Sequence, residues 1–280
     1  MALEASMAGA GAASTPPARE PATSLPALRV HGLHKHYPAA RQPVLRGVDL
    51  VVPPGASVAL LGANGSGKST LLRCCLRLVE PCRGEVDLLG ARVNQLGRDE
   101  LRALRCRTGF IFQKHNVVAR LSALSNVIHG AMARRRSPRL WAQGFADKAC
   151  REQAMRCLDE VGLADCASRR ADRLSGGQSQ RVAIARTLMQ RPEIVFADEP
   201  AASLDPAAGE EVMALFTRLI RAHGMTLIFS SHDLSHARRY ADYIVALREG
   251  RVVMDGASDA IDAAALSELY DRAAPAGDPA

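Results

Sequence analysis

The sequence predicts an α/β fold organised around a mostly parallel, doubly wound sheet, because two kinds of segment alternate along it. Short apolar runs that are typical of buried strands alternate along the chain with longer segments of helical periodicity. Strands that are separated by helices in this order pair in parallel and are covered on both faces. With 280 residues, 48% of them hydrophobic and 23% charged, the chain can bury a sizeable core, which excludes wholesale disorder.

The strands are expected where apolar runs are short and follow one another at intervals long enough for a helix. Four such runs are predicted to lie in the parallel sheet: Ser57–Leu61, Gly109–Phe112, Ile194–Ala197 and Thr226–Phe229. Near the end of the chain, Tyr243–Leu247 and Val252–Met254 flank a Glu-Gly turn, and this pattern predicts a terminal hairpin.

The helices are expected where apolar residues recur every three or four positions. One such pattern runs from Leu71 to Val79, and Pro81 is expected to end it. Further helical patterns cover Asp147–Val161, Gln178–Met189 and Gly209–His223. The segment from about residue 116 to 174 carries helix and little strand, which predicts an inserted helical subdomain.

The two ends of the chain differ in composition from the middle. Residues 1–27 are rich in alanine and proline and lack both the basic start and the apolar core of a signal peptide, so we expect a disordered tail. The ordered domain is predicted over residues 28–256, and residues 257–280 are expected to form a C-terminal helix and tail. No run of about 18 apolar residues occurs, so no membrane-spanning helix is expected.

Charge and cysteine content narrow the partners and the compartment. The formal net charge of +7 favours anionic partners: a nucleotide, a nucleic acid or an anionic membrane surface. Aromatic residues make up only 4% of the chain and are not interleaved with a basic patch, which disfavours nucleic acid as the main partner. The seven cysteines form no C-x-x-C pair, and their odd number predicts reduced thiols in a cytosolic protein.

A glycine-rich loop between the first predicted strand and the first predicted helix indicates phosphate binding. It fits the pattern G-x-x-x-x-G-K-[ST], in which backbone N–H groups curl around phosphate oxygens and the helix dipole adds positive potential. The loop and the residues that follow it are Gly62, Ala63, Asn64, Gly65, Ser66, Gly67, Lys68, Ser69 and Thr70. Lys68 is expected to reach the β- and γ-phosphates, and the Ser69 hydroxyl is suited to Mg²⁺.

A pair of acidic residues ends the third predicted strand. Asp198 and Glu199 follow the apolar run Ile194–Ala197, at the carboxyl end of a strand, where ligands bind in open α/β sheets. Asp198 is expected to hold Mg²⁺, and Glu199 is expected to polarise the water that attacks the γ-phosphate. Together with the glycine-rich loop, these residues predict an enzyme that hydrolyses a nucleoside triphosphate.

Further motifs lie between the glycine-rich loop and the acidic pair, and after the acidic pair. Leu174-Ser175-Gly176-Gly177-Gln178 precedes the acidic strand, and Ser203-Leu204-Asp205 follows it. Gln113 ends one predicted strand and His232 ends another. This order of motifs resembles the ATP-binding subunits of ABC transporters over about residues 28 to 256. The resemblance implies a P-loop NTPase fold with a mostly parallel sheet, an antiparallel β subdomain and an inserted helical subdomain.

The resemblance also implies roles for individual residues. Tyr37, in a stretch ahead of the first predicted strand, is similar to the aromatic residue that stacks on adenine. Gln113 would contact Mg²⁺ and the attacking water, and His232 would reach the γ-phosphate. The signature residues would complete the ATP site of the opposite subunit, with Asp205 in the neighbouring loop. These signature residues are Ser175, Gly176, Gly177 and Gln178.

The cargo follows from resemblance alone, because an ATP-binding subunit does not touch the transported molecule. Several stretches together look like the phosphonate importer branch of the family: Gly109–Gln113, Leu121–Ser122, Asn126–Val127, the segment that contains Trp141, Arg170–Asp172, Asp198–Pro206 and Arg239–Asp242. An importer of phosphate, phosphite or another small solute, or an export or lipoprotein-release ATPase, is an alternative within the family. Such a subunit would form a homodimer on transmembrane permease subunits at the cytoplasmic face of the inner membrane. It would serve a periplasmic solute-binding protein indirectly and would bind no nucleic acid.

Two other classes of protein remain as alternatives. A soluble ABC ATPase of DNA repair would carry long coiled coils, and one of translation would carry two ATPase halves, whereas this chain has no sustained heptads and one set of motifs. A regulatory nucleotide-binding module would not need Glu199, His232 and an intact signature. Co-purification with a membrane permease would distinguish the transporter subunit from both.

Overall fold

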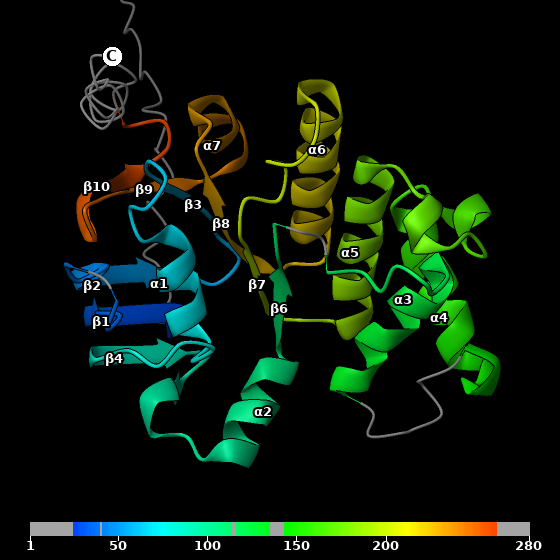
Figure 1. Ribbon diagram of the computed structural model, residues 1–280, viewed down its shortest axis with the longest axis horizontal. Coiled ribbons are helices and arrows are strands. Elements are labelled where there is room, and N and C mark those ends of the chain that lie inside the picture. The colour runs from blue at the N-terminus through cyan, green and yellow to red at the C-terminus, as the bar shows by residue number, and fades with distance from the viewer. Residues whose placement is uncertain (1–24, 40, 114–115, 135–142, 262–280) are drawn as a thin grey trace, which may run out of the picture.

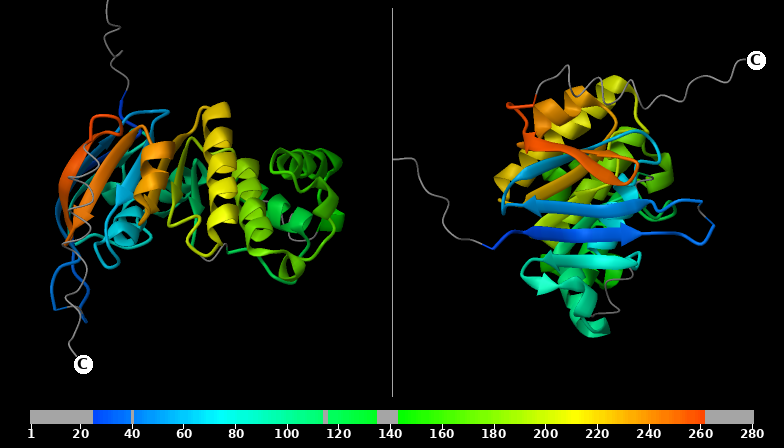
Figure 2. Two further views of the ribbon diagram at one scale, coloured as in Figure 1. Left: turned by 90° about the horizontal axis from the view of Figure 1, so that it is seen from above. Right: turned by 90° about the vertical axis from the view of Figure 1, so that its left-hand side faces the viewer.

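The computed structural model describes residues 25–39, 41–113, 116–134 and 143–261. The predicted tail over residues 1–27 and the predicted C-terminal helix and tail over 257–280 therefore lie for the most part outside the described residues. Within the described ranges the chain forms two sheets, with helices between them and on the far side of the larger sheet (Figures 1 and 2).

The larger sheet has six strands in the order β10-β9-β3-β8-β7-β6. All neighbours are parallel except β9 and β10, which form the terminal hairpin. The strands are β3 (Ser57–Leu61), β6 (Thr108–Ile111), β7 (Ile194–Ala197), β8 (Thr226–Ser231), β9 (Tyr243–Arg248) and β10 (Arg251–Ala257). The mostly parallel sheet predicted from the alternating pattern is confirmed.

The smaller sheet is antiparallel, with the strand order β2-β1-β4-β5. Its strands are β1 (Leu28–Lys35), β2 (Leu45–Val52), β4 (Arg83–Leu88) and β5 (Ala91–Arg92). Tyr37 precedes the first predicted strand, β3, but it lies between two strands that were not predicted, in the loop that leads from β1 to β2. Buried and exposed residues alternate in β1 and β2, so neither strand contains the uninterrupted apolar run that marks β3.

Five helices cover or flank the larger sheet. They are α1 (Lys68–Cys75), α2 (Arg98–Cys106), α5 (Gly176–Gln190), α6 (Pro206–Ala222) and α7 (Leu234–Tyr240), and a short 3₁₀ helix, η1 (Val93–Gln95), precedes α2. The prediction that α1 continues to Pro81 is wrong. Helix α1 ends at Cys75 because Arg77 adopts a left-handed conformation, with φ of 50°. The guanidinium of Arg77 donates to the carbonyls of Val93 and Leu96.

Residues 116–134 and 143–174 contain short helices on the outer side of α5. These are α3 (Ala123–Ile128), η2 (His129–Ala133), η4 (Gln143–Phe145), α4 (Lys148–Glu160), η5 (Ala164–Cys166) and η6 (Ala171–Arg173). Both α3 and α4 pack against α5, and α5 packs against α6 (Figure 1). Asp147 caps α4 by accepting from the N–H of Cys150 at 2.6 Å, as the predicted start of that helix required.

The hydrophobic core has two parts, one on each face of the larger sheet. Val195 and Phe229 pack among the helices, whereas Phe196 and Ile228 pack toward the antiparallel sheet. These neighbouring strand residues are completely buried, which explains why β7 and β8 read as continuous apolar runs. In the described part of the chain the seven cysteines form no disulfide bond. No described helix combines the length and the apolar character needed to cross a bilayer.

Candidate functional site

The glycine-rich loop joins the carboxyl end of β3 to the first turn of α1. Gly65 and Gly67 have φ values of 82° and 107°, which favour glycine. A Cβ on Gly67 would lie 2.9 Å from the carbonyl oxygen of Val44, and a Cβ on Gly62 would overlap the carbonyl oxygen of Leu247. The loop therefore needs glycine at these positions both for its conformation and for close packing against neighbouring backbone.

Lys68 is the first residue of α1, and its ammonium lies within the curve of this loop. Its side chain is 4% exposed, and Nζ donates to the carbonyl oxygens of Gly62 at 2.6 Å and Ala63 at 3.2 Å. Nζ also lies 3.8 Å from Oε1 of Glu199. Burial lowers the pKa of Lys68, while the carboxylates of Glu199 and Asp198 oppose that shift. The result is an ammonium group held inside the curve of the loop, beside the two carboxylates.

Asp198 is buried at the carboxyl end of β7 and accepts two hydrogen bonds on one oxygen. Its Oδ1 accepts from the hydroxyls of Ser69 at 2.8 Å and Ser230 at 2.9 Å. Its Oδ2 lies 3.6 Å from Nη2 of Arg73. The side chain is thus fixed from α1 and from β8, directly beside the Ser69 hydroxyl.

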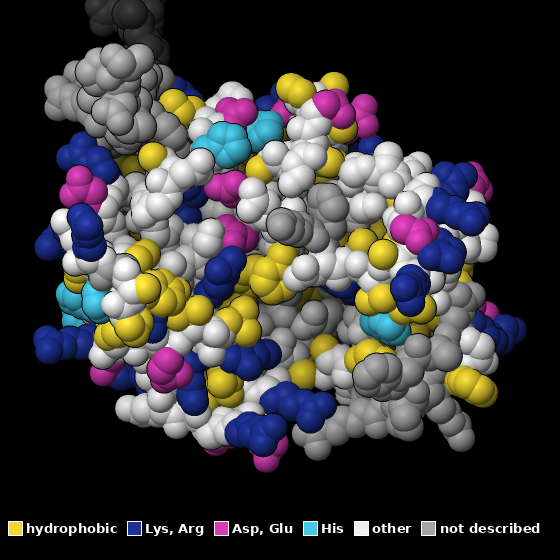
Figure 3. Space-filling model, viewed as in Figure 1, with side chains coloured by type: hydrophobic (Ala, Val, Ile, Leu, Met, Phe, Trp, Pro, Cys, Tyr) yellow, Lys and Arg dark blue, Asp and Glu magenta, His cyan; other side chains and the backbone are white. Residues whose placement is uncertain are grey.

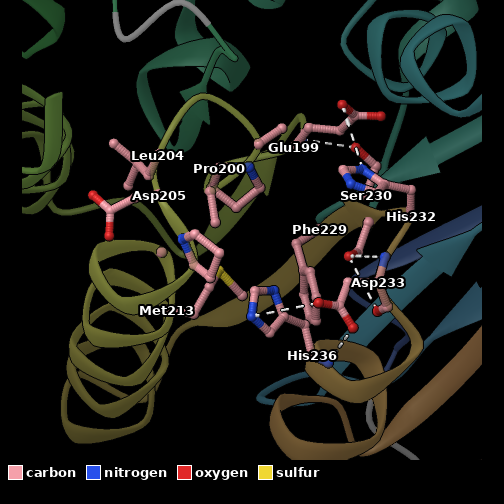
Figure 4. Close-up of a pocket in the computed structure, with 15 residues that line it drawn as sticks. Glu199, Pro200, Leu204, Asp205, Met213, Phe229, Ser230, His232, Asp233 and His236 are labelled. Atoms are coloured by element: carbon pink, nitrogen blue, oxygen red, sulfur yellow. Dashed lines mark hydrogen bonds and ion pairs between the residues drawn. The ribbon is translucent and has the colours of Figure 1, made fainter.

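Glu199 is the point on which the other predicted catalytic residues converge. Nε2 of Gln113 lies 3.3 Å from Oε2 of Glu199, and Nδ1 of His232 lies 4.0 Å from the same oxygen. With Lys68 at Oε1, three side chains from the ends of β6 and β8 and from α1 surround one carboxylate that is 14% exposed. Figure 4 shows Glu199, Ser230 and His232 at one end of a cavity of about 200 Å³.

The signature residues lie elsewhere in the chain, at the start of α5. Ser175 caps this helix through a reciprocal pair of hydrogen bonds with Gln178, at 3.2 and 3.1 Å. A Cβ on Gly176 would come within 3.1 Å of Leu204, so the signature packs against the loop that precedes α6. Asp205 ends that loop and caps α6 by accepting from Ala208. The views in Figures 1 and 2 show α1 and α5 well separated, so one chain does not bring the signature to its own phosphate loop.

Tyr37 lies on the loop between β1 and β2. The ammonium of Lys35 lies 5.0 Å from the centroid of its ring. The same loop returns to β2 through Val44 and Leu45, and both of these residues contact the position of Gly67. The loop that carries Tyr37 therefore ends against the phosphate loop.

The geometry fits a nucleotide phosphate chain and a magnesium ion. Ser66 Oγ is buried in the loop and has no hydrogen-bond partner among the described residues, which suits it to an additional acceptor such as a phosphate oxygen. Mg²⁺ is held through one or two carboxylates together with phosphates and water, and Asp198 and Ser69 offer adjacent oxygen donors of this kind. In the described part of the chain no three His, Cys, Asp or Glu side chains gather as an all-protein metal site.

Two residues outside the predicted set also belong to the site. Ser230 is completely buried, donates to Asp198 and accepts the N–H of Glu199 at 2.9 Å. Arg73 reaches Asp198 from the exposed side of α1. The sequence contains a signal for Ser230, because it is the first polar residue after the apolar run of β8, but the predicted strand stops at Phe229. Nothing in the spacing of Arg73 marks it, since it lies inside a helix.

Comparisons with known proteins agree with this geometry. The family model described as "ABC transporter" matches residues 45–202. The phosphonates import ATP-binding protein PhnC 2 of Synechococcus sp. (strain JA-2-3B'a(2-13)) is 44% identical over 243 residues, covering 87% of this chain and 90% of the relative. The phosphonates import ATP-binding protein PhnC of Bordetella parapertussis is 44% identical over 247 residues, covering 87% of this chain and 96% of the relative.

A solved structure agrees in fold. The ATP-binding cassette MJ0796, determined as a dimer in a post-hydrolysis state bound to ADP and Pi, superposes with a TM-score of 0.73 and 34% identity. The match covers 82% of this chain and 98% of the cassette. The order of motifs along the sequence resembles the same family, and the likeness extends over most of the chain. By its motifs, its fold and its relatives, this chain is an ATP-binding member of the ABC transporter family.

Proposed function

We propose that this chain is the ATP-hydrolysing subunit of a phosphonate importer and that it drives a separate membrane permease. The observation that carries the chemistry is the convergence of Lys68, Gln113 and His232 on the Glu199 carboxylate. The cargo is supported by the relatives named phosphonates import ATP-binding proteins, which match most of this chain at 44% identity.

ATP binds along the phosphate loop. The N–H groups of residues 62 to 67 and the first turn of α1 surround the phosphates, and Lys68 adds a point charge to the β- and γ-phosphates. Tyr37 stacks on the adenine ring from the loop that packs against Gly67. Ser69, Asp198 and Gln113 would hold Mg²⁺, which when bound neutralises charge on the phosphate oxygens.

Hydrolysis uses the carboxylate at the centre of the site. Glu199 accepts a proton from the attacking water, while Gln113 orients that water from the end of β6. His232 donates a hydrogen bond to the γ-phosphate oxygens from the end of β8, and Lys68 stabilises the charge that spreads over them. The short separations between these side chains support their action on one phosphate.

A second copy of the chain completes each site. Ser175, Gly176, Gly177 and Gln178 form the N-terminus of α5, where backbone N–H groups and the helix dipole favour a phosphate. Because these residues do not reach the phosphate loop of their own chain, we infer that they act on ATP held by the other subunit of a homodimer. Asp205, adjacent to the signature in the fold, lies at the same interface.

A permease segment would dock in a groove beside the Gln113 loop. The groove has a volume of about 320 Å³ and is lined by Leu78, Phe110, Phe112 and His129. Leu78 is 45% exposed, and the rings of Phe110 and Phe112 lie 4.2 Å apart. On the face drawn in Figure 3, hydrophobic side chains gather among lysines and arginines over α1 and the segment after it. Docking there would bring the permease next to Gln113 and would hold the subunit at the cytoplasmic face of the inner membrane.

Growth on a phosphonate tests the cargo. A strain that lacks this chain should fail to grow with methylphosphonate as the sole phosphorus source and should grow normally on phosphate. The parental gene should restore growth, and a Lys68→Ala gene should not. Equal growth of the deletion strain and its parent on several alkylphosphonates, with other uptake routes removed, would contradict the proposed cargo.

A further inference from the structure

One carboxylate of α6 holds three side chains of α7. Oε1 of Glu210 accepts from the hydroxyl of Tyr240 at 2.6 Å and also from Nη1 of Arg239. Oε2 of Glu210 lies 3.2 Å from Nε2 of His236. The His236 side chain is 16% exposed and that of Glu210 is 36% exposed, so the contact between these two is partly shielded from water, whereas Arg239 is exposed. We name this group of four side chains the Glu210 clamp.

The clamp lies close to both loops of the ATP site. Helix α6 begins directly after Asp205, and α7 begins directly after His232 and Asp233. Asp233 caps α7 by accepting from the N–H of Ser235 at 2.7 Å and that of His236 at 3.3 Å. His236 is therefore bonded through its backbone to the residue that follows His232 and through its ring to Glu210.

The space between the two loops is not filled by side chains. The cavity of about 200 Å³ that begins at Glu199 and His232 continues between α6 and α7, where Met213 and His236 line it. In Figure 4 the ring of His236 lies between Met213 and Asp233 at the side of the cavity away from Glu199. Because side chains do not fill this gap, the polar contacts of the clamp connect α6 and α7 at its edge.

Two donors of the clamp, Tyr240 and Arg239, remain protonated over the working pH range. Burial, together with the hydrogen bond to Glu210, raises the pKa of Tyr240 to about 12. Arg239 stays charged at any physiological pH. Glu210 thus keeps two permanent donors on Oε1, and its Oε2 stays directed at His236.

We propose that Glu210 and His236 are positioning residues for ATP hydrolysis, which hold the His232 loop in a fixed arrangement relative to the Asp205 loop and to Glu199. The inference rests on the proposed function, because it takes His232 and Glu199 as groups that act on the γ-phosphate. Neither Glu210 nor His236 touches the nucleotide. Loss of the clamp should leave ATP binding intact and should slow the chemical step.

Steady-state kinetics of purified variants tests this proposal. Glu210→Ala and His236→Ala should each lower kcat about tenfold, which is the effect of misplacing one charge-assisted hydrogen bond. KM and the affinity for a fluorescent ATP analogue should stay within about twofold of the parent. The double variant should be no slower than the slower single variant, because both changes remove the same contact. Glu210→Gln, whose amide can still accept from Tyr240, should recover most of the rate.

A matched ion pair away from the site provides the control. Glu193 pairs with Arg107 through two hydrogen bonds, at 2.6 and 2.9 Å, at the opposite end of β7. Glu193→Ala should keep the parental kcat. If the parent hydrolyses ATP and neither Glu210→Ala nor His236→Ala changes its rate, the positioning role is contradicted and the proposed function stands. An equal loss of rate in Glu193→Ala would have the same meaning. An inactive parent would contradict the proposed function and, with it, this inference.

Discussion

Glu199 combines an unfavourable backbone conformation with the central position in the site. Its φ is 48°, in the left-handed region that residues with a side chain rarely adopt. Such a conformation costs on the order of 1–3 kcal/mol and persists where the surroundings fix it. Here the fixing contact is the hydroxyl of Ser230, which accepts the Glu199 N–H and donates to Asp198. The direction of the Glu199 carboxylate therefore depends on a buried serine of the neighbouring strand.

Removal of that hydroxyl should affect both stability and turnover. Ser230→Ala leaves a buried N–H and a carboxylate oxygen each with one partner fewer, so the free energy of unfolding should fall by about 1–3 kcal/mol. The ATPase rate should fall as well, because Glu199 is no longer held. Urea unfolding and a phosphate-release assay measure the two effects.

A second buried serine serves as the control for Ser230→Ala. Ser258 donates a single hydrogen bond to the carbonyl of Arg238 at 3.3 Å, away from Asp198. Ser258→Ala should cost about 1 kcal/mol at most and should leave the ATPase rate unchanged. Equal effects of the two substitutions on rate would mean that Ser230 has no special relation to Glu199.

The cysteines should differ in their reactivity. Burial raises the pKa of Cys74 and that of Cys157 to about 11, whereas Cys82 is exposed. At pH 8 the two buried thiols stay protonated and inaccessible, so iodoacetamide should label Cys82 first and label Cys74 and Cys157 only after denaturation. Peptide mass spectrometry reads this order directly. Early labelling of Cys157 in the native protein would show that α4 does not pack on α5 as described.

At the scale of the elements, α5 connects the helical segment to the rest of the molecule. Its outer face packs against α3, η2 and α4, and its N-terminus carries the signature residues. One close approach in this contact is made by Gly130 of η2, where an added Cβ would overlap the carbonyl oxygen of Arg186 on α5. The distance between η2 and α5 is therefore set by a glycine.

Substitution of that glycine should separate the two elements. Gly130→Ala should lower the free energy of unfolding by about 1–3 kcal/mol, because the backbone of η2 must move away from α5. Gly144 in η4 has no neighbour within 4 Å of an added Cβ and provides the matched control. Gly144→Ala should change stability by less than about 0.5 kcal/mol. Equal stability of the two variants in thermal and urea unfolding would contradict this packing.

The elements that can be predicted from the sequence are those whose pattern is complete within a single segment. The predicted bounds of β7 match the observed ones because all four of its residues are buried. Helix α4 is predicted between the residues that cap it, Asp147 and Val161. Strands β1 and β2 and helix α2 were not predicted, because buried residues in them are interrupted by exposed ones and none contains the continuous apolar run that marks β3.

The site can be predicted residue by residue but not as a set of contacts. Most predicted residues lie where a strand ends or a helix begins, and motif spacing is enough to find such positions. Which side chains meet depends on the strand order of the sheet, which spacing does not specify. For that reason the motifs do not predict that the amide of Gln113 contacts Glu199, and they miss Ser230.

At the scale of the whole molecule, the separation of α1 from the start of α5 predicts that two chains share each ATP. Glu199→Gln keeps the shape of the site and should bind ATP without hydrolysing it, so it should accumulate as an ATP-bound dimer. Lys68→Ala loses the charge that holds the phosphates and should remain a monomer with ATP. Light scattering with and without ATP measures both masses. A monomeric Glu199→Gln that is saturated with ATP would contradict the shared site.

The rate of ATP hydrolysis by Glu199→Gln, measured beside the parent at saturating MgATP, tests the central claim most directly. The substitution removes the basicity of the carboxylate on which Lys68, Gln113 and His232 converge, and it retains the shape of that side chain and one acceptor oxygen. General-base catalysis contributes about 10²–10⁴-fold, so kcat should fall into that range while ATP binding is kept. Hydrolysis at the parental rate would mean that Glu199 is not the base and that the mechanism proposed for this site is wrong.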